Sequence, residues 1–154
     1  MSFGYVVLGF NSYPKRGEAA PSNVLIQDAA GNDNRFTTTI GGSATNDNDF
    51  QAPFAVQAGQ AITFGFYSQH TGNVSQYAWS ILNINDLEGI VASYSISPSS
   101  GVIDGGTGTN WTNLVITIAS SINPGAQAEH QVRLSTQNSG GTTIKDYTLI
   151  LMSP

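Results

Sequence analysis

Hydrophobic and polar residues alternate with a period of two along most of this chain, which is typical of half-buried β-strands. No window keeps the spacing of three and four residues that an amphipathic helix needs. The alternation is most regular over 60–68, 76–84 and 113–120. The residues predicted to share a buried face are Ile62, Phe64 and Phe66 in the first segment, Tyr77, Trp79 and Ile81 in the second, and Leu114, Ile116 and Ile118 in the third. The pattern therefore predicts an all-β protein.

Shorter β-prone runs, separated by Gly, Asn, Asp and Pro, complete the predicted strands. They cover residues 4–10, 24–28, 35–40, 91–97, 130–137 and 142–152. The runs at 24–28 and 35–40 flank "AAGNDN", so we expect them to pair as a hairpin. For "NINDLEGI", residues 83–90, we expect a loop between strands, with one helical turn as the alternative.

Four stretches occur in the order expected of one known family of β-sandwiches. "AGQAITFGFYS" looks like the second strand of that family, "QYAWSI" like its third, "SISPSSGVI" like its recurrent serine-proline-serine-glycine turn, and "PGAQAEHQVRLSTQNSGGTTIKDYTLIL" like its last two strands. On these stretches residues 52–154 resemble a bacterial or phage immunoglobulin-like domain of the putative-Ig type. The resemblance implies an immunoglobulin-like antiparallel β-sandwich with Trp79 in its core.

The chain also departs from that family in two ways and extends beyond it. It has no inter-sheet cysteine pair, and His130 stands where a corner tyrosine is expected. Residues 1–51 lie outside the resemblance, and we expect them to form an N-terminal β extension, a strand and a hairpin packed on the sandwich. The predicted organisation is therefore an extension over 1–51 and a sandwich over 52–154, which by itself implies no function.

Composition narrows the classes of function. Only 10% of the 154 residues are charged, the net charge is -5, and the five Lys and Arg residues are scattered, so we expect no nucleic-acid partner. Without cysteine, neither disulfides nor thiolate sites can form. The N-terminus lacks the features of a signal peptide, and no apolar run approaches the length of a membrane helix. We therefore expect a protein made in the cytoplasm, with no membrane partner.

A sequence doublet, "NDNRF" and, 14 positions later, "NDNDF", has two interpretations. Asn and Asp oxygens suit a calcium ion, and Asp47 and Asp49, followed by Asp33, are the candidate ligands. The doublet lacks the calcium loop that ends in glutamate, however, and Asn and Asp are also favoured in β-turns. We expect two similar turns that deliver Phe36 and Phe50 to the core, and no cofactor, with Ca²⁺ as the alternative.

No catalytic spacing is found among the histidines and acids. His70 lies in the polar stretch "SQHTGN" and His130 near a strand start, so we expect a surface histidine and a corner-packing one. Neither a Gly-x-Ser-x-Gly elbow nor the His-x-His or His-Glu-x-x-His spacing of a zinc site occurs, and the ten acids fall mostly on predicted turns. We expect no enzyme activity and no catalytic residues.

Two features point to contacts with a partner. Residues 4–10 form a continuous apolar run rather than an alternation, which implies that both faces are covered, and Tyr5, Val7 and Phe10 are its candidate contact residues. Trp111 follows the glycine-rich stretch "GGTGT". We expect it in a loop, where its indole either stacks on a sugar ring or a neighbouring subunit, or folds back over the sandwich edge.

Together these features favour a non-enzymatic virion structural protein. The composition is similar to that of phage capsid decoration proteins, so we expect a decoration or cement protein that binds a lattice of capsid subunits as part of a homo-oligomeric assembly. Its location would be the virion, after synthesis in the host cytoplasm. Two alternatives stay open. One is a carbohydrate-binding lectin that stacks sugars on Trp111, Tyr94 or Tyr67, and the other is a self-assembling filament or inclusion protein.

Overall fold

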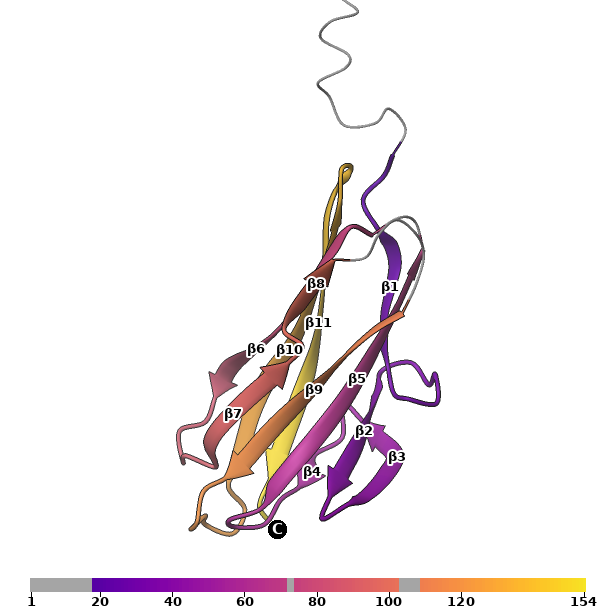
Figure 1. The fold of residues 1–154 in the computed structure, drawn as a ribbon. Helices are drawn as coiled ribbons and strands as arrows, with labels where there is room; N and C mark the ends of the chain where they lie inside the picture. The colour runs from indigo at the N-terminus through magenta and orange to yellow at the C-terminus, as the bar shows by residue number, and fades with distance from the viewer. Residues whose placement is uncertain (1–17, 72–73, 103–108) are drawn as a thin grey trace, which may run out of the picture.

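Eleven β-strands in two facing sheets make up the described part of the chain (Figure 1). The structure is a computed structural model that describes residues 18–71, 74–102 and 109–154, except for the side chains of Asn46, Asp47 and Thr109. Every regular secondary-structure element within these residues is a β-strand. The prediction of an all-β sandwich is confirmed, while membership of the immunoglobulin-like family stays a prediction.

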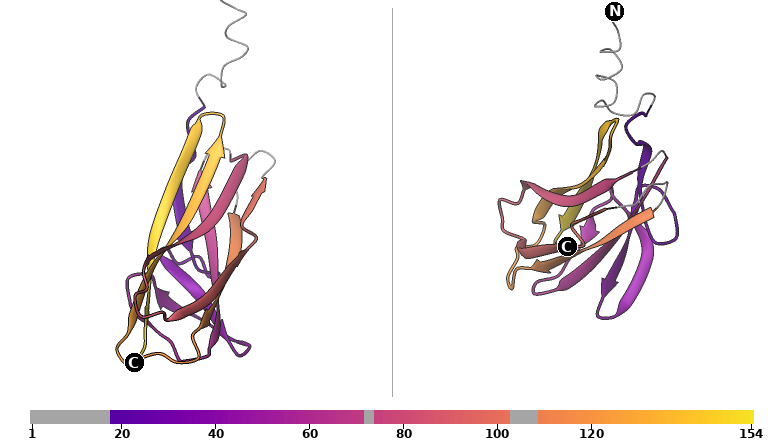
Figure 2. Two further views of the ribbon diagram at one scale, coloured as in Figure 1. Left: turned by 90° about the vertical axis from the view of Figure 1, so that its left-hand side faces the viewer. Right: turned by 45° about the horizontal axis from the view of Figure 1, so that its top comes forward.

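The strands are divided between a six-stranded and a five-stranded sheet (Figure 2). In chain order they are β1 (Ser22–Gln27), β2 (Arg35–Ile40), β3 (Ser43–Asp49), β4 (Phe54–Ala55), β5 (Ala61–Thr71), β6 (Gln76–Asn85), β7 (Val91–Ser97), β8 (Ser100–Val102), β9 (Thr109–Ile118), β10 (Gln127–Asn138) and β11 (Gly141–Met152). The six-stranded sheet has the order β3-β2-β5-β9-β7, with β1 also paired to β5. The five-stranded sheet has the order β4-β11-β10-β6-β8, and its β4–β11 pair is parallel.

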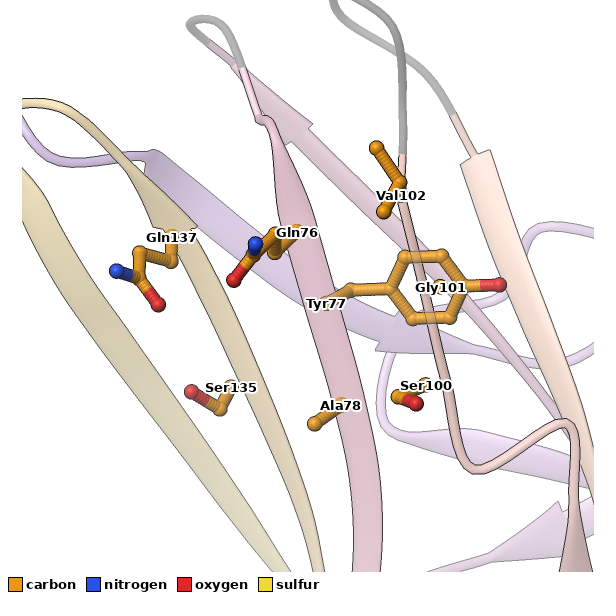
Figure 3. Close-up of a pocket in the computed structure, with 8 residues that line it drawn as sticks. All are labelled: Gln76, Tyr77, Ala78, Ser100, Gly101, Val102, Ser135 and Gln137. Carbon is orange, nitrogen blue, oxygen red and sulfur yellow. The ribbon is translucent and has the colours of Figure 1, made fainter.

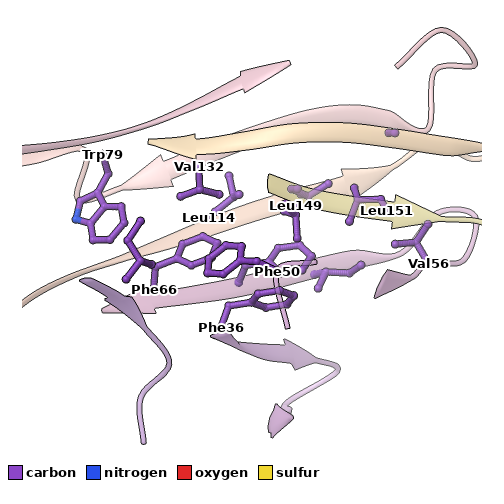
Figure 4. Packing of buried hydrophobic residues seen from close by; sticks show 14 of the residues in the cluster. Phe36, Phe50, Val56, Phe66, Trp79, Leu114, Val132, Leu149 and Leu151 are labelled. Atoms are coloured by element: carbon purple, nitrogen blue, oxygen red, sulfur yellow. The ribbon is translucent and has the colours of Figure 1, made fainter. Parts of the chain in front are cut away.

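The hydrophobic core lies between the two sheets and takes inward-facing side chains from both (Figure 4). The predicted triplets on β5 and β9 are all buried, as is Trp79, with Tyr77 and Ile81 packed beside it. Aromatic rings fill the middle, where the ring centroids of Phe36 and Phe50 lie 5.3 Å apart in an edge-to-face contact. Since full burial of one phenylalanine contributes about 1.5–3 kcal/mol, this cluster is a main source of stability.

The two copies of the doublet lie side by side as antiparallel neighbours. Arg35 of β2 pairs with Asp49 of β3, and the Phe50 amide donates to the Asn34 carbonyl at 3.3 Å. Both phenylalanines, Phe36 and Phe50, are fully buried, as predicted. The prediction of two similar turns is wrong for the second copy. The first copy is a turn, with a φ of 61° at Asn34, but pairing with β2 keeps the second copy in strand β3 up to Asp49.

Strands β1 and β2 do not form the predicted hairpin. They follow one another along the same edge of β5, β1 beside residues 67–71 and β2 beside residues 63–65, and the hairpin partner of β2 is β3. The connection closes a turn of its own, because the Asp28 carboxylate accepts hydrogen bonds from the backbone amides of Ala30 and Asn32, both at 2.9 Å. Only one isolated bridge joins β1 to the described part of this connection.

No helix forms between β6 and β7, as predicted, but β6 continues through Asn85, so the connection covers only residues 86–90 of the predicted loop. Its order comes from Asp86, whose carboxylate accepts hydrogen bonds from the backbone amides of Ile90 at 2.8 Å and Val91 at 3.0 Å. These two bonds satisfy backbone donors that the start of β7 would otherwise leave unpaired.

After β7 the chain leaves the six-stranded sheet and joins the five-stranded sheet as β8. The crossing contains a cis peptide bond between Ser97 and Pro98. Both sheets hold it, because the Trp79 amide donates to the Ser99 carbonyl at 2.6 Å and the Thr112 hydroxyl donates to the Pro98 carbonyl at 2.6 Å. This crossing fixes β8 beside β6, where the first candidate surface described below is found.

Residues 18–21 lie against the β10–β11 hairpin. The Asn138 side-chain amide donates to the Ala19 carbonyl at 2.8 Å, and the Thr143 hydroxyl donates to the Pro21 carbonyl at 2.6 Å. A Cβ atom on Gly140 would lie only 2.5 Å from the Glu18 carbonyl oxygen, so the close approach requires glycine. The described part of the chain therefore begins at this end of the sandwich.

Candidate docking surfaces on the two sheets

A shallow hollow of about 350 Å³ lies on the outer face of the five-stranded sheet, next to the β10–β11 hairpin (Figure 3). Its floor is a cross-strand row of small side chains, Ser135 of β10, Ala78 of β6 and Ser100 of β8. The next row consists of Gln137, Gln76 and Val102. The described lining residues are uncharged, so a partner that fills the hollow would not have to desolvate an ion.

The edge of this hollow depends on one glycine. Figure 3 shows the Tyr77 ring lying across the β8 backbone at Gly101. A Cβ atom at Gly101 would stand 2.5 Å from the Tyr77 hydroxyl oxygen, so any other residue here would displace the Tyr77 ring. Gly101 therefore lets the tyrosine close the sandwich at this edge while β8 stays paired with β6.

Exposed aliphatic side chains lie on the same sheet and in the turn after β6. Ile144 of β11, which extends the floor row beyond Ser135, is 55% exposed, and Val102 of β8 is 78% exposed. Ile84 of β6 is also exposed, and Leu87 in the turn after it is 92% exposed. On the outer face of the described six-stranded sheet, by contrast, the exposed large hydrophobic residue is aromatic, Trp111. The two outer surfaces are therefore chemically different.

Trp111 and Tyr67 are direct cross-strand neighbours on the outer face of the six-stranded sheet. Their chain neighbours Asn110, Thr112 and Phe66 are buried, so strand alternation turns both aromatic side chains outward. Trp111 is 49% exposed. The prediction that it lies in a loop is wrong, because pairing with β5 begins before it and extends β9 over Thr109 and Asn110.

Beside this aromatic pair lies a fixed row of polar groups. Gln27 of β1 is the cross-strand neighbour of Tyr67. Its side-chain amide donates to the carboxylate of Asp33 at 2.8 Å and to the amide oxygen of Gln69 at 3.3 Å. Asp33 and Gln69 are exposed, so this network presents hydrogen-bonding groups to solvent next to Tyr67.

Two of the three candidate calcium ligands, Asp33 and Asp49, already accept hydrogen bonds within the protein. Asp33 accepts the hydrogen bond from Gln27, and the Asp49 carboxylate accepts one from the Gln51 amide at 2.9 Å. The side chain of Asp47 lies outside the described part of the structure. Among the side chains that are described, no three Asp, Glu or His residues come close enough to hold a metal ion.

Both histidines are buried. The prediction of a surface position for His70 is wrong, since it is 3% exposed at an inward position of β5. Burial lowers the pKa of His70 below its usual value of 6.5. Burial also lowers the pKa of His130 on β10, although the nearby carboxylate of Asp86 opposes part of that change. Burial therefore favours the neutral form of both imidazoles.

A buried polar network joins the two sheets behind the aromatic pair. The Trp79 indole donates to the Asn110 side-chain oxygen at 2.7 Å, and the Asn110 amide donates to the Ser68 hydroxyl at 2.7 Å. We did not predict this network from the sequence. The signal was present, because Asn110 continues the buried positions of β9 at steps of two from Leu114. It also places Asn110, which begins a glycosylation sequon, inside the fold.

The remaining candidate contact residues, Tyr5, Val7 and Phe10, lie outside the described residues. In the part of the chain that the structure describes, no helix is long and apolar enough to cross a membrane. No protein-family model matches the sequence, and no curated protein is significantly similar to it.

Proposed function

We propose that this protein is a non-enzymatic virion structural protein, a capsid decoration or cement protein of a bacteriophage that binds a lattice of capsid subunits. It would act in the virion, in a homo-oligomeric arrangement set by the lattice. The observation that carries the proposal is the outer face of the five-stranded sheet, where an uncharged hollow adjoins exposed aliphatic side chains.

This surface has the chemistry of a protein contact. Ile144 and Val102 expose apolar surface to water. Covering that surface is favourable by about 25 cal/mol of free energy for each Å². The small side chains of Ser135, Ala78 and Ser100 let a partner approach the backbone closely. The amides of the neighbouring glutamines supply hydrogen bonds for the rim of the contact, as in other protein interfaces.

The N-terminal segment supplies the second contact in this proposal. Residues 18–21 lie on the β10–β11 hairpin, and Gln137, which lines the hollow, is on β10 next to the turn of that hairpin. The apolar run at 4–10 precedes these residues in the chain and is the candidate second contact on its composition. A strand of this composition is prone to aggregate when it is uncovered. Pairing with a capsid subunit would cover it and would also bind the protein to the capsid.

A pair of arginine substitutions tests the proposal. Ser100→Arg places a long charged side chain in the hollow, whereas Ser95→Arg places the same side chain at an exposed serine on β7 of the other sheet. Each purified variant would be mixed with capsids from the phage whose genome carries the gene, and binding measured by co-sedimentation. We expect the wild type and Ser95→Arg to sediment with capsids and Ser100→Arg to remain in solution, with unchanged circular dichroism.

Two results would contradict the proposal. One is a wild-type protein that stays monomeric in size-exclusion chromatography and never binds capsids. The other is a gene neighbourhood without capsid and portal genes, which would favour a filament or inclusion protein. If Ser100→Arg binds capsids as well as the wild type does, the hollow is not the contact surface.

A further inference from the structure

We propose that the outer face of the six-stranded sheet carries a second binding site, a stacking platform for a neutral saccharide formed by Trp111 and Tyr67. This site and the hollow lie on different sheets, so the two proposals can be tested separately. Three observations lead to it: the placement of the two rings, the polar groups beside them, and the side chains that surround them.

The two rings are adjacent and face outward. Directly opposed residues on antiparallel strands have Cβ atoms about 4.5–5.5 Å apart, so the side chains of Trp111 and Tyr67 lie next to each other. The indole remains 49% exposed even though its neighbours along β9 are buried. Exposed aromatic side chains can stack on the C–H face of a sugar ring, which has an apolar side but also needs polar partners at its edge.

Those polar partners are already held in place. Gln27 is the cross-strand neighbour of Tyr67. Its side-chain amide nitrogen donates hydrogen bonds to the Asp33 carboxylate at 2.8 Å and to the Gln69 amide oxygen at 3.3 Å. Since Asp33 and Gln69 are both exposed, the second carboxylate oxygen of Asp33 can accept a hydrogen bond from a sugar hydroxyl and the amide nitrogen of Gln69 can donate one. Groups that are fixed before binding lose little conformational entropy when a ligand arrives.

The surroundings favour a neutral saccharide over a protein or an anionic ligand. The next two cross-strand rows on this face run through Gly65 and Asn113, and through Thr63 and Val115, and they carry no charge. The exposed aliphatic residues that a protein partner would cover are on the other sheet. The carboxylate of Asp33 would repel an acidic sugar.

Tyr94 provides a matched control. It is as exposed as Trp111, at 49%, and also lies in the six-stranded sheet. Its cross-strand neighbour is the buried Ile116, however, so it points toward the inner side at the open edge of the sandwich. Tyr94 therefore has the same exposure without belonging to the platform.

Affinity electrophoresis of the full chain tests the proposal. The native protein would be run through gels that contain neutral glucan, mannan or galactan, with a polysaccharide-free gel as reference. We expect at least one of these polysaccharides to retard the wild type. Trp111→Ala should weaken that retardation by about tenfold or more, the loss of a favourable ring contact, and Tyr94→Ala should change it by less than about twofold.

The outcomes separate the alternatives. Absence of retardation in all three gels, or equal losses for Trp111→Ala and Tyr94→Ala, would overturn the proposal. Loss of capsid binding in Trp111→Ala with unchanged retardation would make this face a protein contact and would also overturn it. Should Trp111→Ala fail to fold, Gln69→Ala decides the question, since this exposed residue must still weaken retardation if the polar row binds sugar.

Discussion

The inner and outer faces of strands β5 and β9 differ completely although their residues alternate one by one. On the inner face, Phe66 and Leu114 are fully buried, and the polar side chain of Asn110 is buried only because it is hydrogen bonded. On the outer face, Tyr67 and Trp111 meet water. One pair of strands can therefore stabilise the fold with its inner face while its outer face stays accessible to a ligand.

The two tryptophans should show the largest contrast. Trp79 is 2% exposed and stacks on Phe66, so Trp79→Ala should lower the free energy of unfolding by about 3–5 kcal/mol, the usual cost of truncating a buried aromatic residue. Trp111→Ala should cost less than about 1 kcal/mol because the side chain is half exposed. Urea denaturation followed by circular dichroism measures both. A cost below about 1 kcal/mol for Trp79→Ala would mean that the inner face is wrongly assigned.

The next contrast concerns two asparagines on β9. Asn110→Ala removes the acceptor of the Trp79 indole and the donor to Ser68, so we expect a loss of about 1–3 kcal/mol, the cost of leaving buried polar groups unpaired. The control Asn113→Ala, at an exposed position of the same strand, should stay within about 0.5 kcal/mol of the wild type. Equal effects in the same urea titration would show that the buried network does not matter.

Histidines at inward positions should make stability depend on pH. Burial lowers the pKa of His70 and of His130 in the folded protein below 6.5, so the unfolded chain binds more protons than the fold. The stabilisation is therefore present above pH 6.5 and is lost as the pH falls below it. Each site can change the free energy of unfolding by at most about 1.4 kcal/mol per pH unit.

Thermal unfolding at about pH 7.5 and about pH 5.5 checks this dependence, in a range where the carboxylates stay ionised. We expect a lower melting temperature at the acidic value, and a smaller decrease in the double variant His70→Gln, His130→Gln. If the wild type melts at the same temperature at both pH values, the two imidazoles are not held neutral by the fold.

Changes at the exposed doublet should have the smallest effect. The Asp49 carboxylate caps the turn after β3 through the Gln51 amide, and an asparagine oxygen can accept the same hydrogen bond. The double variant Asp47→Asn, Asp49→Asn should therefore unfold within about 0.5 kcal/mol of the wild type, and EDTA should not alter the melting temperature. A large calcium-dependent rise in melting temperature would instead establish a metal site.

Alternation along each strand made the core predictable from the sequence. It identified the triplets on β5, β6 and β9. The same alternation also puts His70 on the buried face of β5. Counting in steps of two from Ile62 reaches His70, at the end of the same strand. The polar composition of "SQHTGN" suggested a loop, but pairing with β1 and β9 keeps β5 extended as far as Thr71. Tertiary pairing overrode the local turn preference.

Strand partners and surface neighbours could not be predicted in the same way. Tyr67 and Trp111 are 44 positions apart in the chain and become neighbours only through the β5–β9 register. Alternation along a strand shows which residues share a face but not which strand lies beside it, and β2, for example, pairs with β3 rather than β1. The candidate platform therefore needed the structure, whereas the aromatic core did not.

Quenching of the two tryptophans tests the assignment of inner and outer faces most directly. A slip of one residue in the strand register would exchange the faces, and the chain has only two tryptophans, so single-tryptophan variants Trp79→Phe and Trp111→Phe report on each position separately. In acrylamide titrations we expect the Trp111 fluorescence that remains in Trp79→Phe to be strongly quenched, and the Trp79 fluorescence that remains in Trp111→Phe to be protected. Protection of Trp111 together with strong quenching of Trp79 would contradict the account.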